Sequence, residues 1–384
     1  MPAKAEAKGV RCSIIGCSDD RRGRLIPLAA YGPVSPAEAA FAALDSAFQK
    51  VEAAGDLFER SFLLAGKTVR LRVAGQELGE CLCVPLAHLP AAPGDGRAPD
   101  LTVLAIDRSG FPAPRPAMPD PACPGAPGVS AQRDILASPD GRFVCEFDVQ
   151  SGSVWCLDRK TAQVVGAADS AGELALRDKG RPLQPLMAFW LDQGRIQPLH
   201  AGLVARNGQG VMLAGGGGAG KSTAALCCLT GGFDFLGDDY IVLESAEDGS
   251  FTGHSLYSSA FLDPEHLTRF SGLASHAVRG RYAEEDKHLL LLSKLFAGRL
   301  PARVPIRYVL LPRVRAGGQA RLAVATRGEA LRRLVPSCLL RGPRLGREGF
   351  NVLVKLVERV ECRWLDLGAD LEAVPRVVEN LLGA

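Results

Sequence analysis

The chain has 384 residues, of which 47% are hydrophobic and 23% charged, and its formal net charge is +3. This composition is typical of a globular protein long enough for two domains, and so small a net charge gives no reason to expect nucleic acid or an anionic membrane as a partner. No run of 18 apolar residues predicts a membrane span, and the N-terminal apolar run is too short for a signal peptide. We therefore expect a cytoplasmic protein.

The eleven cysteines follow no common metal or disulfide spacing. They occur as CSIIGC, CLC and CC with scattered single residues, and no C-x-x-C pair is present. We expect them to be small, buried apolar residues in a reducing compartment rather than metal ligands.

Residues 1–110 have a mixed pattern. Ser35, Pro36 and Glu38 open a segment of helical spacing as a capping box does, and residues 61–75 and 101–110 have the pattern of strands. No catalytic constellation is found in this part. We expect a separate N-terminal α+β domain that recognises a substrate or a partner.

Residues 111–128 contain seven prolines in eighteen positions, which predicts an irregular linker. Beyond it, residues 131–167 alternate in the manner of strands around the turn pairs Asp140-Gly141 and Ser151-Gly152, which predicts a β-meander. Strand and helix patterns then alternate to the end of the chain. We expect one α/β domain over residues 129–384 that includes the meander.

The most specific motif is the glycine-rich loop, residues 215–222, which fits G-x-x-x-x-G-K-[ST]. An apolar strand pattern leads into it and a helix pattern leads out. Backbone N–H groups of such a loop converge on phosphate oxygens, the lysine reaches the β- and γ-phosphates, and the serine binds Mg²⁺. The pattern predicts ATP or another nucleoside triphosphate with Mg²⁺, held by Gly215, Gly216, Gly217, Gly218, Ala219, Gly220, Lys221, Ser222 and Thr223.

Two adjacent acids, Asp238 and Asp239, follow the next predicted strand. One carboxylate can lie beside the metal while the other accepts a proton from an attacking hydroxyl. His200 begins a strand expected to pair with the strand before the loop, which brings it near an aspartate or a phosphate. Lys287 is a candidate clamp for the moving phosphoryl group, with a solvated lysine as the alternative.

His200-Ala-Gly, the glycine-rich loop and the acid pair together resemble the catalytic domain of HPr kinase/phosphorylase. The resemblance covers about residues 130–384 and extends to the HPr-kinase-like superfamily, which includes tailoring kinases of lasso-peptide type. It implies a P-loop phosphoenolpyruvate-carboxykinase-like kinase core, with Asp238 as base, Asp239 on the metal side and His200 in support. The Gly-Arg-Asn segment linked to phosphorolysis in HPr kinase is absent here, so the resemblance does not extend to phosphorylase activity.

Two functions remain open on these grounds. The first is an ATP- and Mg²⁺-dependent kinase that transfers the γ-phosphoryl group to a hydroxyl of a peptide, a protein or a small molecule. The alternative is a nucleotide-gated regulatory module with slow hydrolysis. A carboxykinase would need metal-binding and carboxylate-binding residues that the sequence does not show.

Residues 299–347 hold twelve arginines, no lysine and a single acid, Glu329. Such a run can attract an anionic partner, and the alternative is a set of arginines solvated on the surface. Tyr308 is the only aromatic residue within it, so stacking on nucleic-acid bases has no support.

Overall fold

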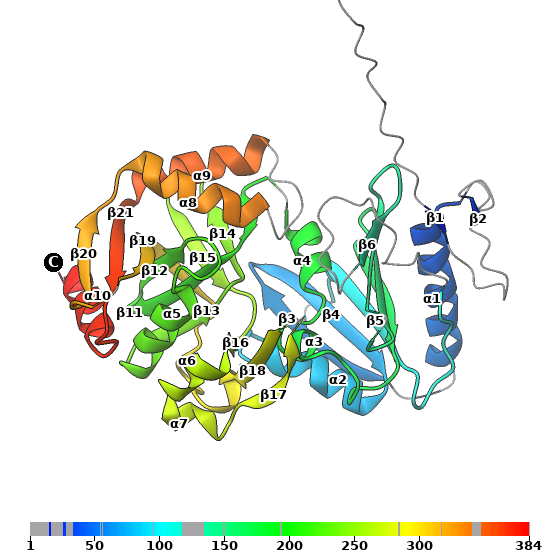
Figure 1. Ribbon diagram of the computed structural model, residues 1–384. Coiled ribbons are helices and arrows are strands. Elements are labelled where there is room, and N and C mark those ends of the chain that lie inside the picture. Colours follow the sequence, from blue (N-terminus) through cyan, green and yellow to red (C-terminus); the bar gives the residue numbers. More distant parts are fainter. Residues whose placement is uncertain are drawn as a thin grey trace, which may run out of the picture.

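The chain is a mixed α/β protein with several sheets (Figure 1). The computed structural model describes residues 15–16, 26–27, 34–53, 55, 57–94, 96–116, 134–148, 150–192, 194–282, 285–315, 317–339 and 347–383. Two short strands, β1 (Ile15–Gly16) and β2 (Ile26–Pro27), pair with each other. The other strands form sheets of seven, nine and three strands.

Helix α1 (Pro36–Glu52) begins where the capping box predicts. Ser35 is its N-cap, and the Ser35 hydroxyl accepts a hydrogen bond of 3.2 Å from the backbone N–H of Glu38. The helix covers one face of the seven-stranded sheet with a row of buried residues, namely Ala37, Ala40, Leu44, Phe48 and Val51.

The seven-stranded sheet contains the predicted β-meander. Its strand order is β3 (Phe58–Leu64), β4 (Lys67–Ala74), β5 (Leu101–Asp107), β9 (Gln163–Ala168), β8 (Ser153–Asp158), β7 (Phe143–Asp148) and β6 (Asp134–Ala137). The opposite face from α1 packs on α2 (Gln76–Cys83) and α4 (Gln184–Leu191), and the 3₁₀ turn η2 (Val84–Leu86) follows α2.

The meander pairs with strands that precede the proline-rich stretch. Strands β5 and β9 are parallel neighbours, with Thr102 opposite Gln163. One sheet therefore takes strands from both sides of the proline-rich stretch, of which residues 117–128 lie outside the described part. How the chain divides into domains stays a prediction.

The nine-stranded sheet positions the glycine-rich loop. Its main order is β10 (Ile196–Leu199), β14 (Ile241–Ser245), β15 (Phe251–Ser255), β19 (Arg303–Val314), β12 (Gln209–Ala214), β11 (Ala201–Arg206) and β13 (Asp234–Gly237), with β21 (Glu361–Leu367) beside β19 and β20 (Arg321–Val324) beside β21. Strands β12, β19 and β21 run parallel, so their carboxyl ends lie at one edge.

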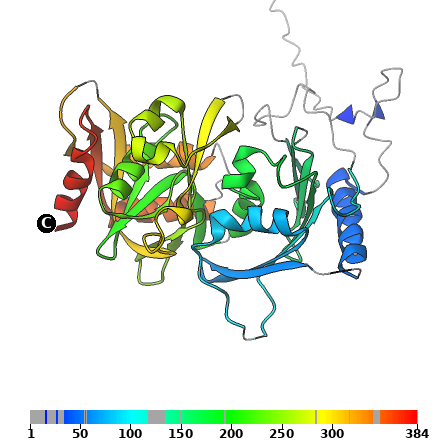
Figure 2. The same cartoon turned by 90° about the horizontal axis from the view of Figure 1, so that it is seen from below.

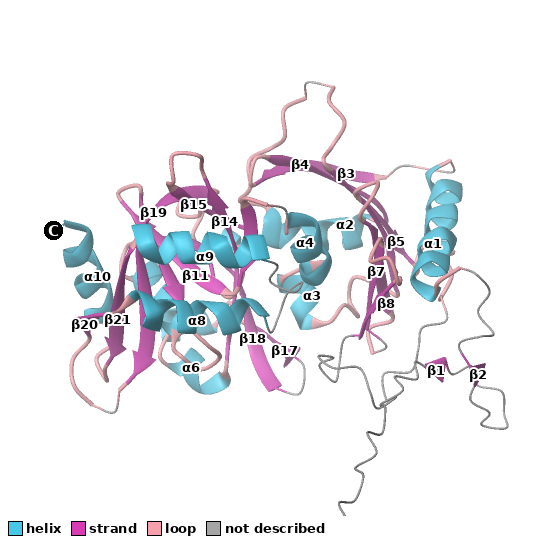
Figure 3. Cartoon of the chain, turned by 90° about the horizontal axis from the view of Figure 1, so that it is seen from above, coloured by secondary structure: helices cyan, strands magenta, loops and turns pink. Residues whose placement is uncertain are grey.

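Helices cover both faces of this sheet. Helices α5 (Lys221–Thr230) and α10 (Ala373–Gly383) pack on one face. Helices α8 (Arg327–Leu339) and α9 (Arg347–Arg359) lie side by side over the other face (Figure 3). The loop between β12 and α5 thus leaves the carboxyl edge of a sheet that is buried on both sides.

A small sheet lies where the two larger ones meet (Figure 2). It consists of β16 (Ser259–Leu262), β18 (Glu285–Leu291) and β17 (Val278–Tyr282), and it carries α6 (Pro264–Thr268) and α7 (Ser271–Ala274). The 3₁₀ turn η3 (Leu292–Lys294) follows it. Helix α3 (Leu176–Gly180) packs on β17 and β18, so the chain leaving the seven-stranded sheet passes this small sheet.

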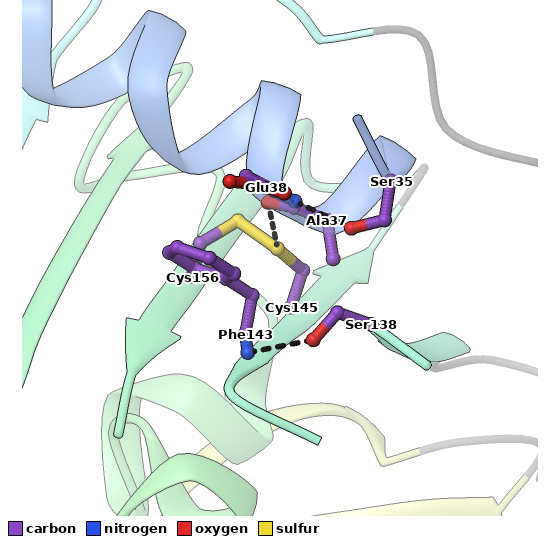
Figure 4. Close-up of a disulfide and its surroundings, with 7 residues drawn as sticks. All are labelled: Ser35, Ala37, Glu38, Ser138, Phe143, Cys145 and Cys156. Carbon is purple, nitrogen blue, oxygen red and sulfur yellow. Dashed lines mark hydrogen bonds between the residues drawn. A yellow bond between two sulfur atoms is a disulfide. The ribbon is translucent and has the colours of Figure 1, made fainter. Parts of the chain in front are cut away.

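The cysteines are the residues for which the structure differs most from the sequence prediction. Cys145 and Cys156 stand directly opposite each other on β7 and β8 and form a disulfide beneath the start of α1 (Figure 4). The expectation that the cysteines are reduced is wrong for this pair, because spacing along the chain does not reveal which residues face each other across a hairpin. Cys227, Cys228 and Cys362 are buried free thiols, as expected.

Candidate active site

The glycine-rich loop closes tightly over the end of the sheet. Gly218 and Gly220 have φ values of 72° and 96°, which favour glycine. A Cβ on Gly220 would also lie 2.4 Å from Cδ1 of Leu367 at the end of β21. Backbone conformation therefore favours glycine at position 218, and at position 220 both backbone conformation and the close approach of β21 require it.

Lys221 is the first residue of α5, and its side chain is 4% exposed. Its ammonium group donates hydrogen bonds to the carbonyl oxygens of Gly215 at 3.0 Å and Gly216 at 3.1 Å. The cation thus lies against the loop at a helix N-terminus, where unpaired backbone N–H groups add positive potential. This is an electrostatic environment that suits an anion.

His200 lies beside the beginning of the loop. Strands β11 and β12 form the expected hairpin, with Ala201 opposite Ala214, so His200 stands next to the point where the loop leaves β12. Its Nε2 lies 2.9 Å from Oδ1 of Asp239. The hydrogen bond between His200 and an aspartate that the sequence suggested is therefore present.

Asp239 is held by two partners in an uncommon backbone conformation. Its φ is 71°, in the left-handed region, and its Oδ2 accepts a 3.0 Å hydrogen bond from Arg181. Burial opposes its ionisation, but Arg181 and His200 outweigh burial and hold the pKa of Asp239 well below its usual range. Asp239 is therefore a fixed carboxylate.

Asp238 has the opposite environment. It is 3% exposed, and neither carboxylate oxygen has a hydrogen-bond partner of ordinary geometry among the described residues. Burial and the charge of Asp239 raise the pKa of Asp238 to about 7, although Arg181, Ser222 and Lys221 act in the opposite direction. The pKa values of the two adjacent aspartates are thus shifted in opposite directions. Burial raises the pKa of Asp238, and ion pairing lowers the pKa of Asp239.

Arg181 is the residue of this site that the sequence analysis missed. It follows α3, 58 positions before Asp239, and its side chain is 1% exposed. Its guanidinium group lies 4.5 Å from the ring centroid of Phe261 and 5.4 Å from that of Tyr240. No motif surrounds Arg181 in the sequence, so only the fold reveals its part in the site.

The segment that carries Arg181 is fastened from both sides. The hydroxyl of Ser259 donates to the carbonyl oxygen of Gly180 at 2.7 Å, and that of Tyr257 donates to the carbonyl oxygen of Pro182 at 2.7 Å. The arginine therefore has little freedom to leave Asp239.

A cavity of about 290 Å³ joins these parts. Lys287 on β18 reaches it from the small sheet, and its Nζ lies 3.7 Å from Oδ1 of Asp263. Of the residues expected at the site, Gly215, Gly216 and Asp238 do not line the cavity, whereas the following do: His200, Gly217, Gly218, Ala219, Gly220, Lys221, Ser222, Thr223, Asp239 and Lys287.

The far wall of the cavity combines charged and apolar side chains. Asp263 also lies 3.2 Å from Nδ1 of His266, and Phe261 and Arg269 complete this side. Two further negative findings apply to the described residues only. No three His, Cys, Asp or Glu side chains gather as metal ligands, and no helix is long and apolar enough to cross a membrane.

No protein-family model matches the chain, and no curated protein does. Among solved structures, it matches the Hpr(Ser) kinase/phosphatase from Coxiella burnetii at 13% identity, over 49% of this chain and 94% of that one. The TM-score of this match is 0.26, so the likeness alone decides neither activity nor substrate.

Proposed function

We propose that the protein is an ATP- and Mg²⁺-dependent kinase with a P-loop, carboxykinase-like core, which transfers the γ-phosphoryl group to a hydroxyl. One observation carries the proposal: the glycine-rich loop with its buried Lys221 lines the same cavity as Asp239 and His200, and Arg181 donates a hydrogen bond to Asp239. The loop suits a triphosphate, and the opposite wall offers an oriented carboxylate to an acceptor. The solved kinase structure is too distant from this chain to support the proposal.

The residues present fit a Mg²⁺ ion. Asp238 is a buried carboxylate with no hydrogen-bond partner among the described residues, and the hydroxyl of Ser222 is near enough to influence its pKa. Mg²⁺ commonly takes one or two protein oxygens and completes its shell with phosphate and water. We therefore assign the metal to Ser222 and Asp238, where it would neutralise charge on the phosphates.

This reverses the two aspartate roles expected from the sequence. Asp239 lines the cavity and is 20% exposed, whereas Asp238 does not line it. A candidate base is judged first by its position and then by its pKa, because it must reach the proton that it accepts. Each carboxylate oxygen has two lone-pair positions, so Asp239 can accept from an acceptor hydroxyl while bound to Arg181 and His200.

In the proposed reaction, Lys221 and the loop N–H groups hold the phosphates, and Lys287 supplies a second cation on the facing wall. The acceptor oxygen forms a bond to the γ-phosphorus while the bond to the bridging oxygen breaks, which leaves ADP. The acceptor proton passes to Asp239 and then to solvent. Arg181 and His200 keep Asp239 ionised until it accepts the proton, and they hold its orientation.

The test is transfer of label from [γ-³²P]ATP to proteins, peptides and small molecules of a cell lysate. We expect a labelled acceptor with the native protein, none with Asp239→Asn, and label with Asp234→Asn, a matched acid on β13. Brisk ATP hydrolysis without any labelled acceptor would count against the kinase proposal.

A further inference from the structure

Three arginines from the arginine-rich part of the chain gather at the carboxyl edge of the nine-stranded sheet. Asp366 on β21 is 2% exposed and lies among the side chains of Arg313, Arg315 and Arg321. Arg313 and Arg321 donate from Nε to different oxygens of Asp366, and Nε of Arg315 lies 3.6 Å away. One buried carboxylate thus orients three guanidinium groups from two strands and a loop.

The ring of Trp364 packs against two arginines of the same surface. The guanidinium group of Arg313 lies 4.5 Å from its ring centroid, and that of Arg333, from α8, lies 5.3 Å from it. We call Arg313, Arg315, Arg321 and Arg333 the arginine cluster. Hydrogen bonds from Arg313 and Arg321 hold the pKa of Asp366 below its usual range, so the cluster binds Asp366 as a carboxylate.

The arginine cluster has hydrogen-bond donors that the described residues leave unused. All three contacts with Asp366 use Nε, and the terminal nitrogens of Arg313, Arg315 and Arg321 make no hydrogen bond within the part of the chain that the structure describes. Arg315 and Arg321 have side chains 53% and 74% exposed. Terminal guanidinium nitrogens form the planar fork that binds carboxylates and phosphates with two parallel hydrogen bonds.

The cluster lies at the same end of the sheet as the cavity but on the opposite face, because Trp364 packs with α8 on one face and Leu367 packs with α5 on the other. Val314 and Leu367 line the cavity and are the chain neighbours of Arg315 and Asp366. The backbone N–H of Arg315 donates to the carbonyl oxygen of Leu367 at 2.9 Å, which ties the two strand ends together. Successive side chains of a strand point to opposite faces, so a partner bound to the cluster has to extend past the ends of β19 and β21 to reach the cavity.

We infer that the arginine cluster is a docking surface for an acidic polypeptide segment. Asp366 is itself a carboxylate held by this cluster, and further carboxylates would use the remaining forks. Nucleic acid fits less well, because Trp364 is 8% exposed and no aromatic face is offered to a base. That the docked segment also carries the phosphoryl acceptor rests on the proposed function.

The test is fluorescence polarisation with a labelled polyglutamate peptide and the full chain, without ATP. Replacing Arg315 and Arg321 together by Gln should weaken binding about tenfold, since each substitution removes charge-assisted hydrogen bonds. The matched control is Arg303→Gln with Arg307→Gln, which removes the same charge from exposed positions on β19 that precede the cluster. The control should change the affinity by less than about twofold.

Three outcomes would overturn the inference: no binding by the native chain, equal loss in both double variants, or tighter binding of an oligothymidine of equal charge. Thermal unfolding of each variant shows whether it is folded. Because this assay needs no phosphoryl transfer, it separates failure of the docking surface from failure of the kinase proposal. A serine placed among the glutamates then tests whether transfer depends on the cluster.

Discussion

The two walls of the cavity are built in different ways. The loop wall comes from consecutive residues, 215–223, between one strand and one helix. The remaining wall is assembled from segments far apart in the chain, represented by His200, Asp239 and Lys287, and Arg181 holds Asp239 from outside the cavity. A contiguous wall can be recognised from a motif, whereas an assembled wall depends on the whole fold. The predictions below perturb the two walls separately.

The largest effect should come from the loop wall. Lys221→Met should lower transfer by about 10²–10³-fold, because it removes a buried cation from the developing phosphate charge. It should also weaken ATP binding, which isothermal titration calorimetry can measure. Lys50→Met, an exposed change on α1, is the control. Unchanged ATP affinity in Lys221→Met would count against the loop as the phosphate site.

Beside the remaining wall, Arg181→Ala should lower kcat by about 10²-fold, because Asp239 loses a charged hydrogen bond and its orientation. ATP affinity should remain nearly unchanged, and added guanidinium ion should restore part of the rate. The pKa of Asp239 should rise once Arg181 is removed, so the acidic limb of the kcat–pH profile should move to higher pH.

Arg195→Ala, which removes an exposed arginine, is the matched control for that variant. A loss of thermal stability without rescue by guanidinium, and without movement of the pH profile, would show that Arg181 is structural only.

Asp238 should make the ligand-free protein less stable as pH rises. Its pKa is raised to about 7 in the folded state, so the folded protein retains a proton that the unfolded chain releases near pH 4. Stability from this group is therefore present at low pH and lost as pH rises toward 7. Asp238→Asn should raise the unfolding free energy at pH 8, without metal or nucleotide, by up to about 4 kcal/mol, since each pKa unit corresponds to about 1.4 kcal/mol.

Chemical denaturation at pH 5 and pH 8 measures this difference, with Asp234→Asn as the control. A variant that is less stable than the native protein at pH 8 would show that Asp238 already has a stabilising partner.

The smallest functional effect should follow loss of the disulfide, which lies in the seven-stranded sheet. Cys145→Ala with Cys156→Ala should lower stability by about 2–3 kcal/mol, as expected for a short closed loop, and should leave kcat unchanged. Denaturation with and without reductant measures the effect, and Cys81→Ala is the control. If reductant does not alter the native protein, the two thiols are not joined in solution.

Local features of the fold could be predicted from the sequence. The capping box at Ser35 marks the start of α1, and the turns at Asp140 and Ser151 mark the meander, because both signals depend on neighbours in the chain. The pairing of β5 with β9 could not be predicted in this way. It joins residues about sixty positions apart in parallel, and no local pattern encodes that contact.

The candidate site likewise combines features that the sequence predicts with features that it does not. The glycine-rich loop and the His200–Asp239 hydrogen bond follow from a motif and a hairpin. Arg181 lies in no recognisable sequence motif. The different environments of Asp238 and Asp239 arise from burial, which the residues next to them in the sequence do not reveal. The disulfide was missed for a similar reason, since facing positions on strands are set by register.

The division of labour between the two aspartates is the central claim, and Mg²⁺ titrations of Asp238→Asn and Asp239→Asn test it most directly. We predict that Asp238→Asn raises the Mg²⁺ concentration needed for half-maximal transfer and retains much of the kcat at saturating metal. Asp239→Asn should lose kcat by about 10³-fold with an unchanged Mg²⁺ requirement. The reverse pattern, with Asp239 controlling metal and Asp238 controlling kcat, would contradict the account.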